Sequence, residues 1–221
     1  MSAETIRLHH VPQARSFRVL WFLHEAGLPH EVVLHSFFDR SLRAPDYLAL
    51  SPAGRVPAVE IGGMRMAESG AILEYLAETR APQLGRAPGH PERAAYLEAL
   101  HYAETIGQHL ANLTQHHVVL RDPSMRSPTV MRLEATRLAR ALAPLGRVGE
   151  WQLPSGFSAA DIALGYGVHL ARLFVRLDEI PGLAEYHARA TARPGFRAAT
   201  EADGPAEIYR RGFYAPPEED A

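Results

Sequence analysis

The segment Ser51–Gly70 combines residue types that suit one kind of ligand. Val56-Pro57 precedes a short run that alternates apolar and polar side chains. Gly62-Gly63 then predicts a two-residue hairpin turn, because both positions tolerate positive φ. If the peptide bond before Pro57 is cis, the backbone amide and carbonyl of Val56 face outward and can bond to a peptide-like molecule. The segment is therefore expected to present a free stretch of backbone next to a hairpin.

Glu68-Ser69 is expected to begin a helix whose apolar positions include Ile72, Leu73 and Leu76. The free N–H groups and the dipole at the start of a helix favour an anion such as a carboxylate, and the Glu68 side chain can hold an ammonium group. Each piece by itself also fits an ordinary hairpin and helix cap. Their combination in this order favours a ligand with peptide groups, a carboxylate and an ammonium group.

Two motifs in this segment, Arg55–Val59 (RVPAV) and Glu68–Ile72 (ESGAI), resemble the glutathione-binding signature of the cytosolic glutathione transferases. In that family the residue before the proline bonds to the cysteinyl part of glutathione through its backbone, and the acid–Ser pair binds the γ-glutamyl end. The resemblance covers nearly the whole chain and implies glutathione as co-substrate. The binding residues that it implies here are Arg55, Val56, Pro57, Glu68 and Ser69.

Chemistry with glutathione needs a thiolate at neutral pH. A free thiol with a pKa of about 8.5 is only slightly ionised there, whereas a hydroxyl donor, a guanidinium group or a helix N-terminus lowers that pKa. Pro12–Trp21 resembles the corresponding segment of bacterial and fungal transferases. It departs from them at two positions, because many of those proteins carry Ser where Ala14 stands and others carry Cys where Arg15 stands.

The nearest hydroxyl is that of Ser16, so we expect Ser16 and Arg15 to stabilise the thiolate together with the start of the helix. Two simpler roles stay open: Ser16 as a helix cap, and Arg15 as a solvated charge. His9 and His10, at the end of the preceding strand, are further candidates.

A basic residue before the run Pro45–Leu48 (PDYL) should bind the glycine carboxylate of glutathione, as the resemblance implies. Arg43 matches that position best, with Arg40 as the alternative. Leu42 replaces the His often found beside it. A solvent-exposed Arg43 with no ligand is the competing interpretation.

The first part of the chain predicts the order β-α-β-α-β-β-α. The run Ile6–Val11 alternates as a strand, an apolar helix follows over Arg15–Ala26 and ends at Gly27, and Glu31–Leu34 reads as a second strand. This order resembles a thioredoxin-like domain. The expected fold class is an α/β thioredoxin-like N-terminal domain followed by an all-α C-terminal helical domain, the architecture of glutathione transferases.

The expected domain boundary lies in the segment 83–90, which is rich in Pro and Gly. Residues 1–82 are the predicted glutathione-binding domain, and 91–221 the helical domain with a second-substrate site. A long helix is expected from Pro91 to about Leu120. Its polar stripe is either a solvated face or the lining of that site. The proposed second-substrate residues are His10, Tyr102, Thr105 and His109.

In the third helical segment, Ser158 and Asp161 match a capping box, S-x-x-D. This motif predicts a helix start and a structural, non-catalytic role for Asp161.

The composition limits the other function classes. The chain has 221 residues, a net charge of −2 and no Cys, so catalytic cysteines, disulfides and thiolate metal sites are excluded. The adjacent pairs His9-His10 and His116-His117 do not form a natural chelate, and we expect no metal. We also expect no nucleic-acid partner and no membrane span, a cytoplasmic location in view of an N-terminus without a signal-peptide pattern, and a homodimer as in the family.

The expected activity is conjugation of the glutathione thiolate to small hydrophobic electrophiles. Three alternatives stay open. One is glutathione-dependent reduction of disulfides or peroxides, with two glutathiones bound side by side. Another is isomerisation or dehalogenation. The third is a non-catalytic binding protein, which the departure at Ala14 favours.

Overall fold

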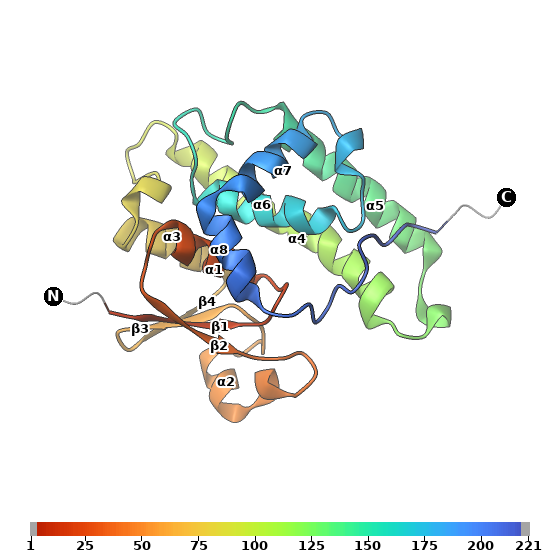
Figure 1. Cartoon of the computed structure of the whole chain (residues 1–221), viewed down its shortest axis with the longest axis horizontal. Helices are drawn as coiled ribbons and strands as arrows, with labels where there is room; N and C mark the ends of the chain where they lie inside the picture. The colour runs from red at the N-terminus through yellow and green to blue at the C-terminus, as the bar shows by residue number, and fades with distance from the viewer. Residues whose placement is uncertain (1–3, 218–221) are drawn as a thin grey trace. The chain divides into compact units, whose positions relative to one another are not determined.

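The structure is a computed structural model that describes residues 4–217, and it divides into two compact units (Figure 1). The first unit runs up to Arg93 and resumes at Ala192–Ile208. The second unit is Ala94–Thr191 together with the segment that begins at Tyr209. Each unit has its own core, so each is described by itself.

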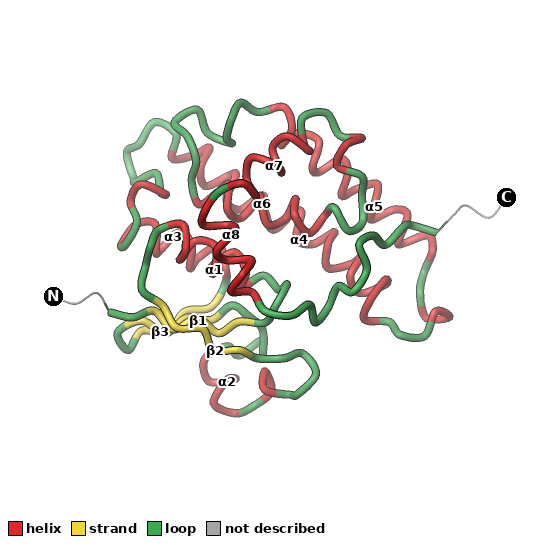
Figure 2. The backbone as a smooth tube through the Cα atoms, in the orientation of Figure 1, coloured by secondary structure: helices red, strands yellow, loops and turns green. Residues whose placement is uncertain are grey.

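The first unit is built on a four-stranded sheet with the order β2-β1-β3-β4. Its strands are yellow in Figure 2. β1 pairs with β2 in parallel, and β3 pairs antiparallel with both β1 and β4. This mixed sheet is that of a thioredoxin-like domain, as the sequence predicts. β2 is an edge strand with every residue at least partly exposed, so it is less buried than its apolar run indicates. The strands are β1 (Ile6–His10), β2 (His30–Leu34), β3 (Ala58–Ile61) and β4 (Met64–Ala67).

Helices cover both faces of this sheet, with α2 on one face and α1 and α3 on the other (Figure 1). α1 is apolar nearly all round, and the side chains from Val19 to Leu23 are fully buried. Such a helix is stable only between other elements, because burial of its apolar surface supplies the driving force. The helices of this unit are α1 (Ser16–Glu25), α2 (Pro45–Leu50), α3 (Ser69–Thr79) and α8 (Pro194–Asp203), with short 3-10 turns at Ser41–Arg43 and Pro82–Leu84.

The outer side of α1 is covered by α8, which comes from near the end of the chain. The ring of Phe196 meets Trp21 edge-on at 4.9 Å between centroids and Phe17 at 5.4 Å. Arg193 forms an ion pair with Glu25, which also accepts a bond from the Trp21 indole at 3.2 Å. The sequence contains no local signal for this return, and residues 192–208 pack in the first unit although they lie within the stretch predicted as the helical domain.

The second unit is helical. α6 is its central helix, buried along almost its whole length, and it begins with the capping box that the sequence predicts: Ser158 N–H donates to Asp161 Oδ2 at 3.0 Å. The long predicted helix is α4, which ends six residues earlier than expected and passes into a π-helix. The elements are α4 (Arg93–Thr114), the π-helix Gln115–Val119, α5 (Pro128–Leu142), α6 (Ala159–Ala171) and α7 (Leu183–Ala192), with 3-10 turns at Pro123–Met125, Ala143–Arg147 and Leu177–Glu179.

None of the helices described between residues 4 and 217 combines the length and apolarity that a membrane crossing requires.

Candidate functional site

The loop before β3 presents a free stretch of backbone. The Val56–Pro57 peptide bond is cis, and the preceding carbonyl, of Arg55, accepts bonds from the Tyr47 hydroxyl at 2.7 Å and the Ser51 hydroxyl at 2.9 Å. Burial raises the pKa of Tyr47 to about 12, so the phenol stays protonated and donates. Among residues 4–217, neither the N–H nor the carbonyl of Val56 takes part in a hydrogen bond. Both groups are therefore available to a ligand with peptide amides.

The start of α3 carries the acid–Ser pair. Glu68 precedes the helix with φ of 71°, and Ser69 is its first residue. The Glu68 side chain is exposed, whereas Ser69 is buried and its hydroxyl accepts a bond from Arg18 at 3.1 Å. A positive φ at a residue other than glycine is uncommon and concentrates at functional sites. Together with the helix dipole, these groups can hold an amino acid head group: the ammonium at Glu68, the carboxylate at the N–H groups of α3.

Arg18 is a residue of this site that sequence analysis missed. Its side chain is only 1% exposed, in the middle of the apolar run of α1. A buried guanidinium group is costly unless it is hydrogen-bonded, and the bond to Ser69 supplies one such contact. The available signal was a single arginine inside the run FRVLWFL, where an apolar residue would pack more easily.

An apolar cluster joins the loop after β1 to the loop before β3 that contains Val56, called here the Val56 loop. Val11 and Ala14 from the first loop pack with Leu42, Tyr47 and Val56 in one buried group. The backbone before α1 and the backbone before β3 are therefore neighbours. A ligand bound to the free backbone of Val56 would lie beside the loop before α1.

Ser16 does not lie open to a ligand in this arrangement. Its side chain is fully buried, and its hydroxyl lies 3.3 Å from both the N–H and the carbonyl of Val11. It fastens the first turn of α1 to the end of β1. Arg15 stands at the N-cap position of α1 and is half-buried.

Two exposed arginines come from the segment before α2, and one of them, Arg43, reaches the Val56 loop. A Cβ built on Gly54 would come within 3.9 Å of Arg43 Cδ, so the Arg43 side chain passes over the residue next to Arg55. Arg40, the alternative to Arg43, is also exposed and has φ of 66°. The exposed cations can attract a second carboxylate.

In the second unit, the structure uses two of the proposed second-substrate residues to join α4 to α5. The Tyr102 hydroxyl donates to the Ala141 carbonyl at 2.9 Å, and His109 Nδ1 lies 2.8 Å from Glu134. Burial acts to raise the pKa of Glu134, but bonds from His109 and two further donors lower it overall. Thr105 is exposed. His10, in the first unit, is completely buried.

The fold and this site define a class: a thioredoxin-like domain with a ligand-binding loop before β3, combined with a helical unit. Residues 4–78 match the family model described as glutathione S-transferase, N-terminal domain. These residues are therefore the N-terminal domain of a glutathione S-transferase, and the chain as a whole is similar to members of that family.

Three relatives illustrate the similarity. The chain is 37% identical to a maleylacetoacetate isomerase of Rhizobium meliloti over 109 residues, 49% of this chain and 51% of the relative. It is 28% identical to the disulfide-bond oxidoreductase YfcG of Escherichia coli over 200 residues, 86% of this chain and 91% of the relative. A glutathione transferase from Pseudomonas putida, solved with glutathione disulfide bound, superposes with a TM-score of 0.80 at 26% identity, over 91% of this chain and 93% of that chain.

The chain spans about a third to a half of the length of the curated relatives with which it shares at least 37% identity. The activities named for those relatives are therefore attributed to the relatives alone.

Proposed function

We propose that the protein is a glutathione transferase that conjugates the glutathione thiolate to small hydrophobic electrophiles. The observation that supports this most is the meeting of three segments in the first unit. The loop before α1 and the Val56 loop share one apolar cluster, and the start of α3 bonds to Arg18 of α1. One tripeptide can then contact all three segments.

Each part of glutathione has a proposed partner. The amide and carbonyl of Val56 bond to the cysteinyl residue and orient its thiol, with Pro57 shaping the loop. Glu68 and Ser69 bind the γ-glutamyl ammonium and carboxylate, with Arg18 holding the Ser69 hydroxyl. Two exposed guanidinium groups, those of Arg43 and Arg55, are proposed for the glycine carboxylate.

The thiol must lose its proton before it reacts. We propose that the N-terminus of α1 and the Arg15 guanidinium lower the thiol pKa. Ser16 is the alternative, but its hydroxyl would first have to leave the Val11 carbonyl. The thiolate sulfur then attacks an electrophilic carbon. A carbon–sulfur bond forms while the bond to a leaving group breaks, and that group departs with the bonding electron pair.

Titration with glutathione tests this proposal, with thiolate ultraviolet absorbance as the readout for the wild type, Arg15→Gln and Ser16→Ala. We expect thiolate at neutral pH in the wild type, a clear loss in Arg15→Gln and little change in Ser16→Ala. A loss of thiolate in Ser16→Ala alone would identify Ser16 as the residue that activates the thiol. Glutathione binding without any thiolate in the wild type would sink the transferase proposal in favour of a binding protein.

A second candidate is glutathione-dependent disulfide reduction. It is favoured by the similarity to a disulfide-bond oxidoreductase over 86% of this chain. The chain has no Cys, so the mixed disulfide would form between glutathione and the substrate. One thiolate attacks the disulfide and releases one substrate thiol; a second glutathione thiolate releases the other and gives glutathione disulfide. Turnover of hydroxyethyl disulfide that exceeds turnover of chlorodinitrobenzene would decide for this reaction.

The remaining expectations complete the proposal. Residues 1–82 are proposed as the glutathione-binding domain, 83–90 as the linker and 91–221 as the domain that supplies the second-substrate site, with α8 added to the first domain. Tyr102, Thr105, His109 and His10 are retained as second-substrate candidates, although three of them are buried or engaged as described above. The proposed assembly is a cytoplasmic homodimer.

A further inference from the structure

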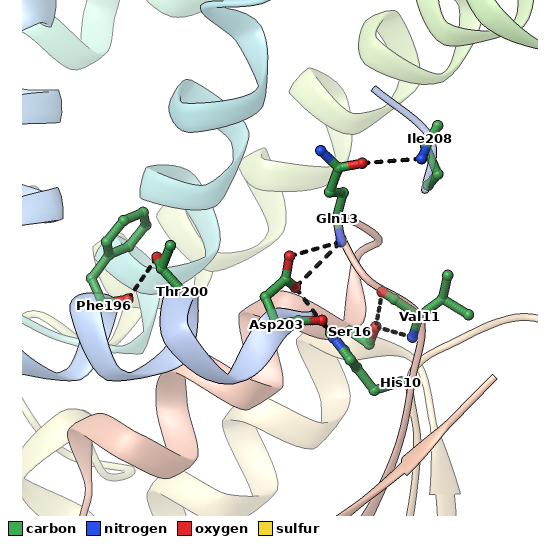
Figure 3. A network of polar contacts seen from close by, with 8 residues as sticks. All are labelled: His10, Val11, Gln13, Ser16, Phe196, Thr200, Asp203 and Ile208. Atoms are coloured by element: carbon green, nitrogen blue, oxygen red, sulfur yellow. Dashed lines mark hydrogen bonds and ion pairs between the residues drawn. The ribbon is translucent and has the colours of Figure 1, made fainter. Parts of the chain in front are cut away.

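Gln13 lies at the centre of the loop before α1 in an uncommon conformation. Its φ is 64°, in the left-handed region that side chains other than glycine seldom adopt. Residues of α8 and of the segment after it hold two polar groups of Gln13. Its backbone N–H points at Asp203, and its side-chain oxygen accepts a bond from the N–H of Ile208 at 3.0 Å (Figure 3). A conformation of this kind persists only where its surroundings hold it.

Both carboxylate oxygens of Asp203 contact the loop between β1 and α1. The Gln13 N–H lies 3.1 Å from Oδ2 and 3.3 Å from Oδ1. His10 Nε2 lies 3.2 Å from Oδ1 and 3.2 Å from the Asp203 carbonyl (Figure 3). Because both neighbours of Nε2 are acceptors, this nitrogen carries the ring hydrogen. One carboxylate therefore connects the last residue of β1 with the loop that follows it.

The position of Asp203 is unfavourable for its own helix. It is the last residue of α8, and a carboxylate at the C-terminal end of a helix opposes the helix dipole. The next residue, Gly204, has φ of 93°, and a Cβ built there would come within 3.3 Å of Pro12 Cγ. The end of α8 thus lies directly against the loop. A residue that costs helix stability at such a contact has a role outside the helix.

We infer that Asp203 is a positioning residue for thiol activation: its carboxylate holds Gln13, and through Gln13 the start of α1, in the orientation that receives the glutathione sulfur. This inference rests on the proposed function. Asp203 lies 190 residues along the chain from Gln13 and does not touch the thiol. If Gln13 relaxes to negative φ, the peptide groups between Gln13 and the first turn of α1 rotate, and the N-terminal end of α1 changes its orientation toward the sulfur.

Asp203→Asn is the informative substitution, because it keeps the shape of the side chain. Its amide presents one oxygen and one NH2 group. Whichever way it turns, the NH2 group faces either the Gln13 N–H or the His10 N–H, and two donors then meet. Glu201→Gln is the matched control, since it removes the same charge from an exposed position on the same helix.

Three quantities separate a positioning role from a merely structural one: the thiol pKa from thiolate absorbance, the Kd of glutathione by calorimetry, and kcat with chlorodinitrobenzene. For Asp203→Asn we expect a thiol pKa raised by about one unit and a kcat at least about tenfold lower, with Kd within about twofold of the wild type. Glu201→Gln should match the wild type in all three.

Unchanged thiol pKa and kcat in a folded Asp203→Asn variant would overturn the inference, as would parallel losses of glutathione affinity and melting temperature without a separate effect on the thiol. If Asp203→Asn does not fold, Asp203→Ser takes its place, because its hydroxyl still accepts one N–H. The same thiol pKa as in the wild type would then overturn the inference. A wild type that binds no glutathione or forms no thiolate refutes the proposed function instead, before any variant is compared.

Discussion

The carbonyl of Arg55 is fixed by two hydroxyl groups from the same side of the loop, and one of them belongs to Tyr47 of α2. The Tyr47 ring also packs against two imidazoles, His35 at 4.6 Å and His9 at 5.5 Å between centroids. Burial lowers the pKa of His35, so this ring stays neutral at physiological pH. The orientation of the Val56 peptide groups thus depends on the Tyr47 hydroxyl and on the two imidazoles packed against the Tyr47 ring.

Removal of that hydroxyl gives the first prediction at this scale. In Tyr47→Phe the tilted ring contacts with His9 and His35 remain, but the Arg55 carbonyl keeps only the bond from Ser51. We expect the Kd of glutathione to rise about three- to tenfold and stability to fall by about 1 kcal/mol. Calorimetric titration measures the first quantity and urea unfolding the second.

Tyr75→Phe is the control, since Tyr75 lies on α3 and is part of neither the apolar cluster nor the Val56 loop. Equal glutathione affinity in Tyr47→Phe and the wild type would show that Ser51 alone fixes the loop.

Features of single residues were predictable where a sequence motif determines the local backbone conformation. Local patterns predict the helix start at Ser69 and make a free Val56 backbone conditional on a cis bond before Pro57, and the structure has both; the binding roles of Val56, Glu68 and Ser69 stay predictions. Ser16 shows the limit of this approach. A hydroxyl at the start of a helix has several acceptors within reach, and only the three-dimensional contacts show that its hydroxyl lies against Val11. The role of Arg18 was not predicted, because nothing in the local sequence indicates that its charged side chain is buried.

At the scale of elements, the packing of α8 on α1 has a measurable contribution to stability. Phe196 is 5% exposed and contacts the rings of both Phe17 and Trp21. Phe196→Ala removes this contact and leaves a cavity, so we expect a loss of about 3–5 kcal/mol in the free energy of unfolding. Urea unfolding followed by tryptophan fluorescence reports it directly, because Trp21 lies at the contact.

Arg197→Ala provides the comparison, as Arg197 is the next residue on α8 and is exposed. Its effect should stay within about 0.5 kcal/mol. If both variants lose the same small amount, α8 is a loosely attached helix, and the positioning role of Asp203 at its end would lose its basis.

Most elements were predictable, because their signals are local. Alternation gave β1, the glycine pair gave the turn between β3 and β4, and the S-x-x-D box gave the start of α6. The return of α8 was not predictable in the same way. Its apolar face is equally suited to any helical neighbour, and only complementary shape selects α1. Likewise, the polar stripe of α4 reads as a lining or a solvated face, whereas much of it bonds to α5.

For the whole molecule, three histidines of the second unit set a limit at low pH. Burial is the main cause that lowers the pKa of His169 to about 3 and those of His187 and His117 to about 4. His169 and His187 stack at 5.4 Å, with ring nitrogens 3.1 Å apart, and Arg172 lies close to both. A proton added to either imidazole would place its positive charge close to the Arg172 guanidinium. Protonation of both rings would also place two positive charges side by side.

The sign of the pH dependence follows from these directions. Each histidine binds a proton more readily in the unfolded chain, where its pKa is near 6.5, than in the folded protein. The unfolded state therefore gains protons as pH falls below about 6.5, and the free energy of unfolding decreases down to the folded pKa values. We expect each of these groups to contribute a loss of roughly 1–3 kcal/mol between pH 7 and pH 4, measured by urea unfolding at each pH.

His187→Gln should flatten part of this dependence, because one of the titrating groups is gone. His101→Gln should leave it unchanged, since His101 is exposed on α4. A profile as steep in His187→Gln as in the wild type would assign the acid sensitivity to other groups.

The return of α8 also has a consequence for biosynthesis. On the ribosome, α1 is made long before its covering helix, because all of the second unit's helices lie between Trp21 and Phe196 in the sequence. Until then the nascent first unit exposes the aromatic side of α1, a surface on which chaperones bind and aggregates begin. The first unit therefore cannot complete its packing until α8 has been made, even though its sheet and its other helices are encoded before Arg93.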